Sequence, residues 1–152
     1  MPARPNRRIA GQILRPMLVL TMALAASGCG SSPITSARIE QAIEVTFANL
    51  VQVQVGWLGI RPMAASEFDV TAVCNKPSAA NAVGAGEWVC RLRWLGPDRQ
   101  TLRDTLDLFV TTDGCYVATP EGENLGGPTL KSSKGADVRN LLSSFEGCFD
   151  TM

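Results

Sequence analysis

The fold is decided by the stretch Glu87-Trp88-Val89-Cys90-Arg91-Leu92-Arg93-Trp94-Leu95, in which apolar and mostly charged side chains alternate. A period of two is typical of a strand with one face in a core and the other in water. The turn residues at 96–99 lead into a second alternating run at 102–110, so the two runs predict a long antiparallel hairpin. Thr112-Asp113-Gly114 predicts another tight turn, and a strand at 115–119 follows it.

The segment before this hairpin contains one helical pattern and two alternating patterns. Apolar side chains recur at helical spacing from 39 to 50, which predicts a helix beginning near Thr35 or Ser36. The period then changes to two at 51–57 and again at 68–74, and this indicates two strands. The stretch 76–86 is rich in glycine and alanine and contains a proline, so we expect a loop there.

The end of the chain is expected to form a second helix. Residues 120–135 are polar and contain several glycines, which predicts an irregular segment. From 137 to 145 the apolar residues fall on one helical stripe, and Gly147 is a typical helix terminator. The order of elements predicts an α+β domain with an antiparallel sheet of about four to five strands. We expect an N-terminal and a C-terminal helix to pack on that sheet.

The first 28 residues show the basic start, apolar middle and small-residue end of a secretory signal. The sequence Ala26-Ser27-Gly28-Cys29 resembles the lipobox of bacterial lipoproteins, which implies cleavage before Cys29 and attachment of acyl chains such as palmitate to its thiol. We therefore expect a signal peptide at 1–28, a flexible tether at 29–35 and a single globular domain at 36–152. A retained membrane anchor and cleavage without lipidation are the alternatives.

Two further resemblances concern location and fold. Gly30 after the cysteine resembles the pattern that sends lipoproteins to the outer membrane in cells with two membranes. The segments Val73-Cys74 and Gly86-Glu87-Trp88-Val89-Cys90 are similar in layout to small secreted or lipid-anchored actinobacterial domains of unknown function. That similarity implies a fold and leaves the function open.

Four cysteines remain when Cys29 is set aside: Cys74, Cys90, Cys115 and Cys148. An even number in an exported chain is typical of disulfides, and four cysteines allow three pairings. We favour Cys74–Cys90 and Cys115–Cys148 because each pair joins neighbours in the expected order of elements. A zinc site is the alternative, but the spacings lack the usual Cys-x-x-Cys pattern and the chain has no histidine.

Charge and composition exclude several classes of function. The sequence after Cys29 carries ten basic and fourteen acidic side chains, a net charge of −4 that argues against nucleic acid as a partner. The absence of histidine excludes the common catalytic triads. A carboxylate pair of Glu121 or Glu123 with Asp104 or Asp107 would be needed for glycosidase-type chemistry, and a solvated acidic surface is the simpler interpretation.

These observations favour a non-enzymatic lipoprotein of the cell envelope, without metal or cofactor, that binds a protein partner or assists an assembly. The alternative is a lipoprotein that binds a small hydrophobic ligand, with Trp57, Trp88 and Trp94 as the candidate ligand-binding residues. A pocket lined by these tryptophans would favour the ligand-binding hypothesis. A filled interior with an exposed apolar patch would favour the protein partner.

Overall fold

The computed structural model describes residues 33–77, 83–122 and 124–151. The expected signal peptide, Cys29 and most of the expected tether lie outside these residues, so the predictions about them stay predictions. The elements run α1 (Ser36–Trp57), η1 (Ala65–Phe68), β1 (Thr71–Asn75), β2 (Gly86–Leu95), β3 (Thr101–Val110), β4 (Cys115–Pro120), β5 (Thr129–Lys131), β6 (Asp137–Arg139) and β7 (Phe145–Cys148).

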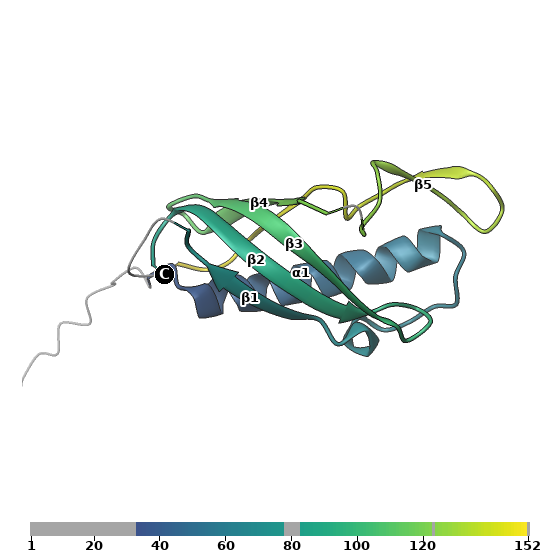
Figure 1. Cartoon of the computed structure of the whole chain (residues 1–152), viewed down its shortest axis with the longest axis horizontal. Coiled ribbons are helices and arrows are strands. Elements are labelled where there is room, and N and C mark those ends of the chain that lie inside the picture. Colours follow the sequence, from purple (N-terminus) through teal and green to yellow (C-terminus); the bar gives the residue numbers. More distant parts are fainter. Residues whose placement is uncertain (1–32, 78–82, 123, 152) are drawn as a thin grey trace, which may run out of the picture.

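The architecture has two layers, a five-stranded sheet and the helix α1 along one of its faces (Figure 1). The strand order is β1-β2-β3-β4-β7, and every neighbouring pair is antiparallel. Strands β5 and β6 form a separate two-stranded sheet at the end of the molecule where α1 ends (Figure 1). The predicted α+β class, the antiparallel sheet and the β2–β3 hairpin are confirmed.

The alternation read from the sequence determines which sheet face meets the helix. The inward side chains of β2 and β3 are buried, namely Trp88, Cys90, Leu92, Trp94, Asp104, Leu106, Leu108 and Val110. They pack against a stripe on α1, and the Phe47 ring meets the Trp94 ring edge-on with centroids 5.0 Å apart. The opposite sheet face is covered by no element among the described residues, and it lies open in Figure 1.

The predicted strand at 51–57 is wrong, because these residues continue α1 to Trp57. Val51 and Val55 extend the buried line that begins at Ile39 and recurs every fourth residue. Valine favours strands only weakly, and burial of this stripe against the sheet outweighs that preference. The predicted cap is confirmed at Thr35, whose hydroxyl oxygen accepts a hydrogen bond from the Arg38 backbone N–H at 3.4 Å.

The predicted C-terminal helix at 137–145 is also wrong, and two short strands, β6 and β7, replace it. The cause is Asn140, which is buried between them. Its amide N–H groups donate to the carbonyl oxygens of Leu125 at 2.6 Å and Gly127 at 2.8 Å, and its side-chain oxygen accepts from the Leu142 N–H. These bonds hold a non-helical backbone, from which Leu142 and Phe145 still reach the core.

Both preferred disulfides are confirmed, and each joins residues directly opposite one another on adjacent strands. Cys74–Cys90 links β1 to β2 and is buried, whereas Cys115–Cys148 links β4 to β7 with Cys148 exposed. The second bond therefore fastens a strand to β4, where a helix was expected. Each bond therefore links an edge strand, β1 or β7, to its neighbour in the five-stranded sheet.

Candidate functional site

The three tryptophans proposed as a ligand platform do not share a surface. Trp88 and Trp94 are 1% and 3% exposed and form part of the core under α1. Trp57 is 49% exposed at the last residue of the helix. The Trp88 indole N–H donates to the Gly84 carbonyl oxygen at 3.1 Å, which satisfies its polar atom inside the protein. Trp88 and Trp94 therefore fill part of the core and leave Trp57 as the exposed tryptophan.

The carboxylates considered for acid–base chemistry are divided between the two sides of the sheet. Asp104 is buried on the helix side, where its Oδ1 accepts from the backbone N–H groups of Thr105 and Gly122. Glu121 is exposed, and the negative charge of Asp107 raises the pKa of its carboxyl. Glu123 lies outside the described residues. Glu121 and Asp107 repel each other in solvent, an arrangement typical of an acidic surface.

The open sheet face carries an apolar cluster that the sequence analysis did not single out. Phe109 on β3 and Val117 on β4 are opposite one another in the register and are 58% and 49% exposed. Two shallow depressions of about 420 and 510 Å³ share these two side chains. An aromatic residue at an outward position of a strand is the signal that could have revealed this cluster, because the neighbouring Leu108 and Val110 already supply the core face.

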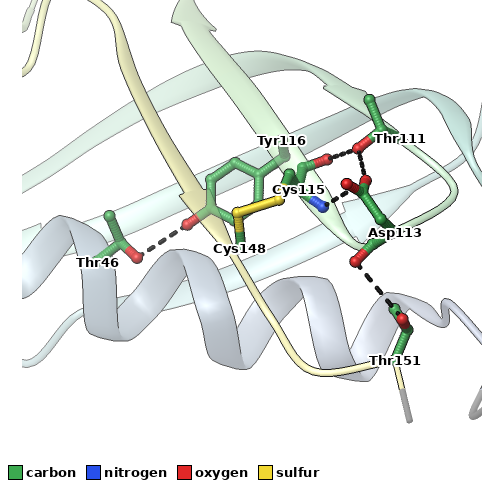
Figure 2. Close-up of a disulfide and its surroundings, with 7 residues drawn as sticks. All are labelled: Thr46, Thr111, Asp113, Cys115, Tyr116, Cys148 and Thr151. Atoms are coloured by element: carbon green, nitrogen blue, oxygen red, sulfur yellow. Dashed lines mark hydrogen bonds between the residues drawn. A yellow bond between two sulfur atoms is a disulfide. The ribbon is translucent and has the colours of Figure 1, made fainter.

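The disulfide Cys115–Cys148 borders this cluster, because both cysteines line one of the two depressions that contain Phe109 and Val117. Tyr116 points to the opposite side of β4, where its hydroxyl donates to Thr46 Oγ1 of α1 at 2.9 Å (Figure 2). Its ring lies over Gly147, where any side chain would clash with it. Burial raises the pKa of the Tyr116 hydroxyl. Gly147 was predicted as a helix terminator, and its role is to make room for this ring.

The hairpin next to the disulfide is fastened by a second group of hydrogen bonds. The Thr111 hydroxyl oxygen lies within hydrogen-bond distance of the Asp113 carboxylate and of the Cys115 carbonyl oxygen (Figure 2). The bond from Thr111 is the main cause that lowers the pKa of Asp113. The Thr151 hydroxyl oxygen lies 3.5 Å from the Asp113 carbonyl oxygen, so the C-terminal segment also contacts this turn. The rim of the open face is thus preorganised.

Charges divide the open face into two halves. Acidic side chains surround the apolar cluster: Glu87 stands opposite Phe109, Glu146 stands opposite Val117, and Asp107 lies two residues before Phe109 on β3. Arg91, Arg93 and Arg103 occupy the other half, where Arg93 and Arg103 are register partners. Arg93 also forms an ion pair of 3.0 Å with Asp69. The face therefore presents an apolar–acidic half, defined by Phe109, Val117, Glu87, Asp107 and Glu146, beside a basic half.

The comparisons with known proteins assign no relatives. No protein-family model matches the chain, and no curated protein and no solved structure matches it either. Within the described residues, none of the helices has both the length and the apolar character needed to cross a membrane. The same residues contain no group of three or more metal-ligating side chains.

Proposed function

We propose that the chain is a non-enzymatic lipoprotein of the cell envelope whose apolar–acidic half binds a protein partner. The observation that carries this proposal is the pair Phe109–Val117, exposed on a sheet face that no described element covers. A large exposed aromatic side chain on a structured strand is typical of protein interfaces, where such residues provide most of the binding energy. The filled core supports a protein partner over the alternative of a small hydrophobic ligand.

The charges indicate what the partner presents. Glu87, Asp107 and Glu146 surround the apolar pair, so a complementary surface carries an apolar side chain flanked by lysine or arginine. The five-stranded sheet is braced by α1 and by a disulfide at its β4–β7 side, and a rigid surface loses little entropy when it binds. We therefore expect a partner that docks without rearranging this domain.

The proposed location combines two observations. Two disulfides indicate an oxidising compartment outside the cytoplasm. The lipobox-like sequence before Cys29 supports attachment to a membrane through acyl chains on that cysteine, in the outer membrane where a cell has two. The described chain begins at Pro33 and α1 at Ser36, so an anchor at Cys29 would hold the domain close to the bilayer. Replacement of Cys29 by serine should release the protein from the membrane fraction.

The experiment compares two variants with matched exposure. Phe109 and Val45 are both 58% exposed, but Phe109 lies on the open face and Val45 on α1. We expect the native lipidated chain to co-purify with a partner, and Phe109→Ser to lose that partner while Val45→Ser retains it. The partner should then be crosslinked through a photoreactive group placed at position 117. Equal loss with both variants, or crosslinking at Val45 instead, would overturn the proposed interface.

A further inference from the structure

The charges of the domain are segregated along its length. We define the distal tip as residues 57–61 at the end of α1 together with the β5–β6 hairpin, residues 129–139. This region contains Arg61, Lys131, Lys134 and Arg139 but one acid, Asp137, so its net charge is +3. The remainder of the sequence after Cys29 has six basic and thirteen acidic side chains, a net charge of −7. The distal tip is therefore basic although the sequence after Cys29 is acidic as a whole.

The two parts of the distal tip are joined by specific contacts. The backbone N–H of Ser133 donates to the Leu58 carbonyl oxygen at 2.8 Å, which attaches the hairpin turn to the end of the helix. Gly59 has a φ of +72°, which a residue with a side chain rarely adopts, and it lies against the Ser133 side chain. The cations at 61 and 134 are consequently held close to this junction.

Exposed apolar surface accompanies the cations. Trp57 is 49% exposed and Ile60 also faces solvent, and both lie within two residues of Leu58. Lys131 is neutralised by Asp137 at 2.6 Å, which leaves Arg61, Lys134 and Arg139 as exposed cations without a described acidic partner. An exposed indole and three exposed cations within one tip offer a stacking surface for a sugar ring and ionic contacts for its anionic groups.

We propose that the distal tip binds a polyanionic glycan of the cell envelope, meaning a polymer of sugar units that carry carboxylate or phosphate. The inference takes the extracytoplasmic location from the proposed function but does not depend on the partner at the open face. The two disulfides indicate a location outside the cytoplasm, which disfavours nucleic acid as the polyanion. The distal tip also lies at the end of the molecule opposite the described N-terminal and C-terminal segments (Figure 1), so it faces away from an anchor that precedes α1.

The test uses the fluorescence of Trp57 in the full-length chain in a neutral detergent. The chain has three tryptophans, of which Trp88 and Trp94 are buried, so quenching by the uncharged quencher acrylamide reports mainly on Trp57. Polygalacturonate is the anionic probe, neutral dextran is the uncharged control, and micelles containing phosphatidylglycerol represent an anionic lipid surface. We expect polygalacturonate to protect Trp57 and neutral dextran to have no effect, with protection lost as salt rises.

Two double variants with the same change in net charge locate the site. Arg61→Glu with Lys134→Glu should weaken polygalacturonate binding about tenfold or more, as measured by calorimetry. Arg91→Glu with Arg103→Glu, on the open face, should change it by about twofold or less. Arg139→Gln provides a milder variant of the distal tip and should weaken binding in the same direction. Phe109→Ser should leave glycan binding unchanged, so that the proposal for the open face and the proposal for the distal tip are tested independently.

Three results would overturn this inference. The first is no protection of Trp57 by polygalacturonate. The second is an equal loss of affinity in the two double variants, which would indicate a response to net charge. The third is protection by phosphatidylglycerol micelles without protection by polygalacturonate, which would assign the distal tip to a lipid surface.

Discussion

The Glu40 carboxylate accepts a hydrogen bond of 2.9 Å from the backbone N–H of Cys74, and this bond joins α1 to the edge of the sheet. Glu44 accepts in the same way from the Ala72 N–H, also at 2.9 Å. Four helical residues rise about 6 Å, and two strand residues advance about 6.6 Å. Because these two distances are nearly equal, carboxylates on successive turns of the helix can accept hydrogen bonds from every second N–H group along the edge strand. This blocks the edge against pairing with another chain.

We predict that Glu40→Ala combined with Glu44→Ala lowers the free energy of unfolding by about 2–4 kcal/mol, because two N–H groups lose charged acceptors. The variant should also self-associate through the uncovered β1 edge. Urea denaturation measures the first effect and light scattering the second. Gln41→Ala is the control, since Gln41 is exposed on the same helix. Unchanged stability in the double variant would show that these bonds contribute nothing.

The two disulfides should differ in their response to reductant. Cys74 and Cys90 are buried, whereas Cys148 is exposed. We predict that mild dithiothreitol reduces Cys115–Cys148 first, because the thiolate reductant reaches its sulfur atoms without unfolding of the sheet. Alkylation followed by peptide mass spectrometry identifies which cysteines react. Simultaneous reduction of both bonds would mean that reduction requires global unfolding.

Removal of each bond should also destabilise the domain to a different degree. Cys115–Cys148 closes a loop of 33 residues and Cys74–Cys90 a loop of 16. The chain-entropy relation gives a loss of about 4 kcal/mol for the first bond and about 3 kcal/mol for the second. Paired cysteine-to-alanine variants, measured by urea denaturation, test this order. A larger loss for the shorter loop would indicate that native packing around Cys74 and Cys90 outweighs the entropy of the unfolded chain.

The sequence predicted the hairpin at 86–110 well and the ends of the domain poorly, for a physical reason. The hairpin has a long, regular alternation that only one periodicity fits. Val51, Val53 and Val55 fit a strand period of two, while Val51 and Val55 also fit the four-residue repeat that starts at Ile39. Burial against the sheet selects the helical interpretation. Such selection depends on tertiary packing, which a local pattern does not contain.

Asn140 is a second residue at which tertiary contacts, and not the local pattern, decide the secondary structure. Its side chain bonds to backbone groups 13 and 15 residues earlier, and a pattern within 137–145 cannot reveal these partners. We predict that Asn140→Ala lowers the free energy of unfolding by about 2–3 kcal/mol, because buried carbonyl oxygens lose their donors. Asn49→Ala, at an exposed helix position, should have little effect. Hydrogen exchange should show loosening of β5–β6 and β7 before the β2–β3 hairpin.

The candidate site was less predictable than the fold. Aromatic residues at strand period suit both a core and a ligand platform, and the structure places Trp88 and Trp94 in the core. Phe109 and Val117 become neighbours through the β3–β4 register, and they become exposed because no described element covers that face. Register and coverage are properties of the assembled sheet.

Tyr116 should make stability depend on alkaline pH. Burial raises the pKa of its hydroxyl above the ordinary value for tyrosine, so the folded protein holds this proton more tightly than the unfolded chain does. Its contribution to stability is therefore complete below the unfolded pKa and is lost as pH rises through the folded pKa. We predict that wild type loses stability above about pH 10 more steeply than Tyr116→Phe, which cannot ionise.

The measurement is direct because Tyr116 is the single tyrosine of the chain. Absorbance of the phenolate follows its ionisation, and denaturant unfolding at each pH follows stability. Tyr116→Phe loses the hydrogen bond to Thr46 at every pH, so it should be less stable than wild type near neutrality and approach it in alkali. A constant difference between the two proteins from neutral to alkaline pH would contradict the argument. It would mean that the phenol ionises as readily in the folded protein as in the unfolded chain.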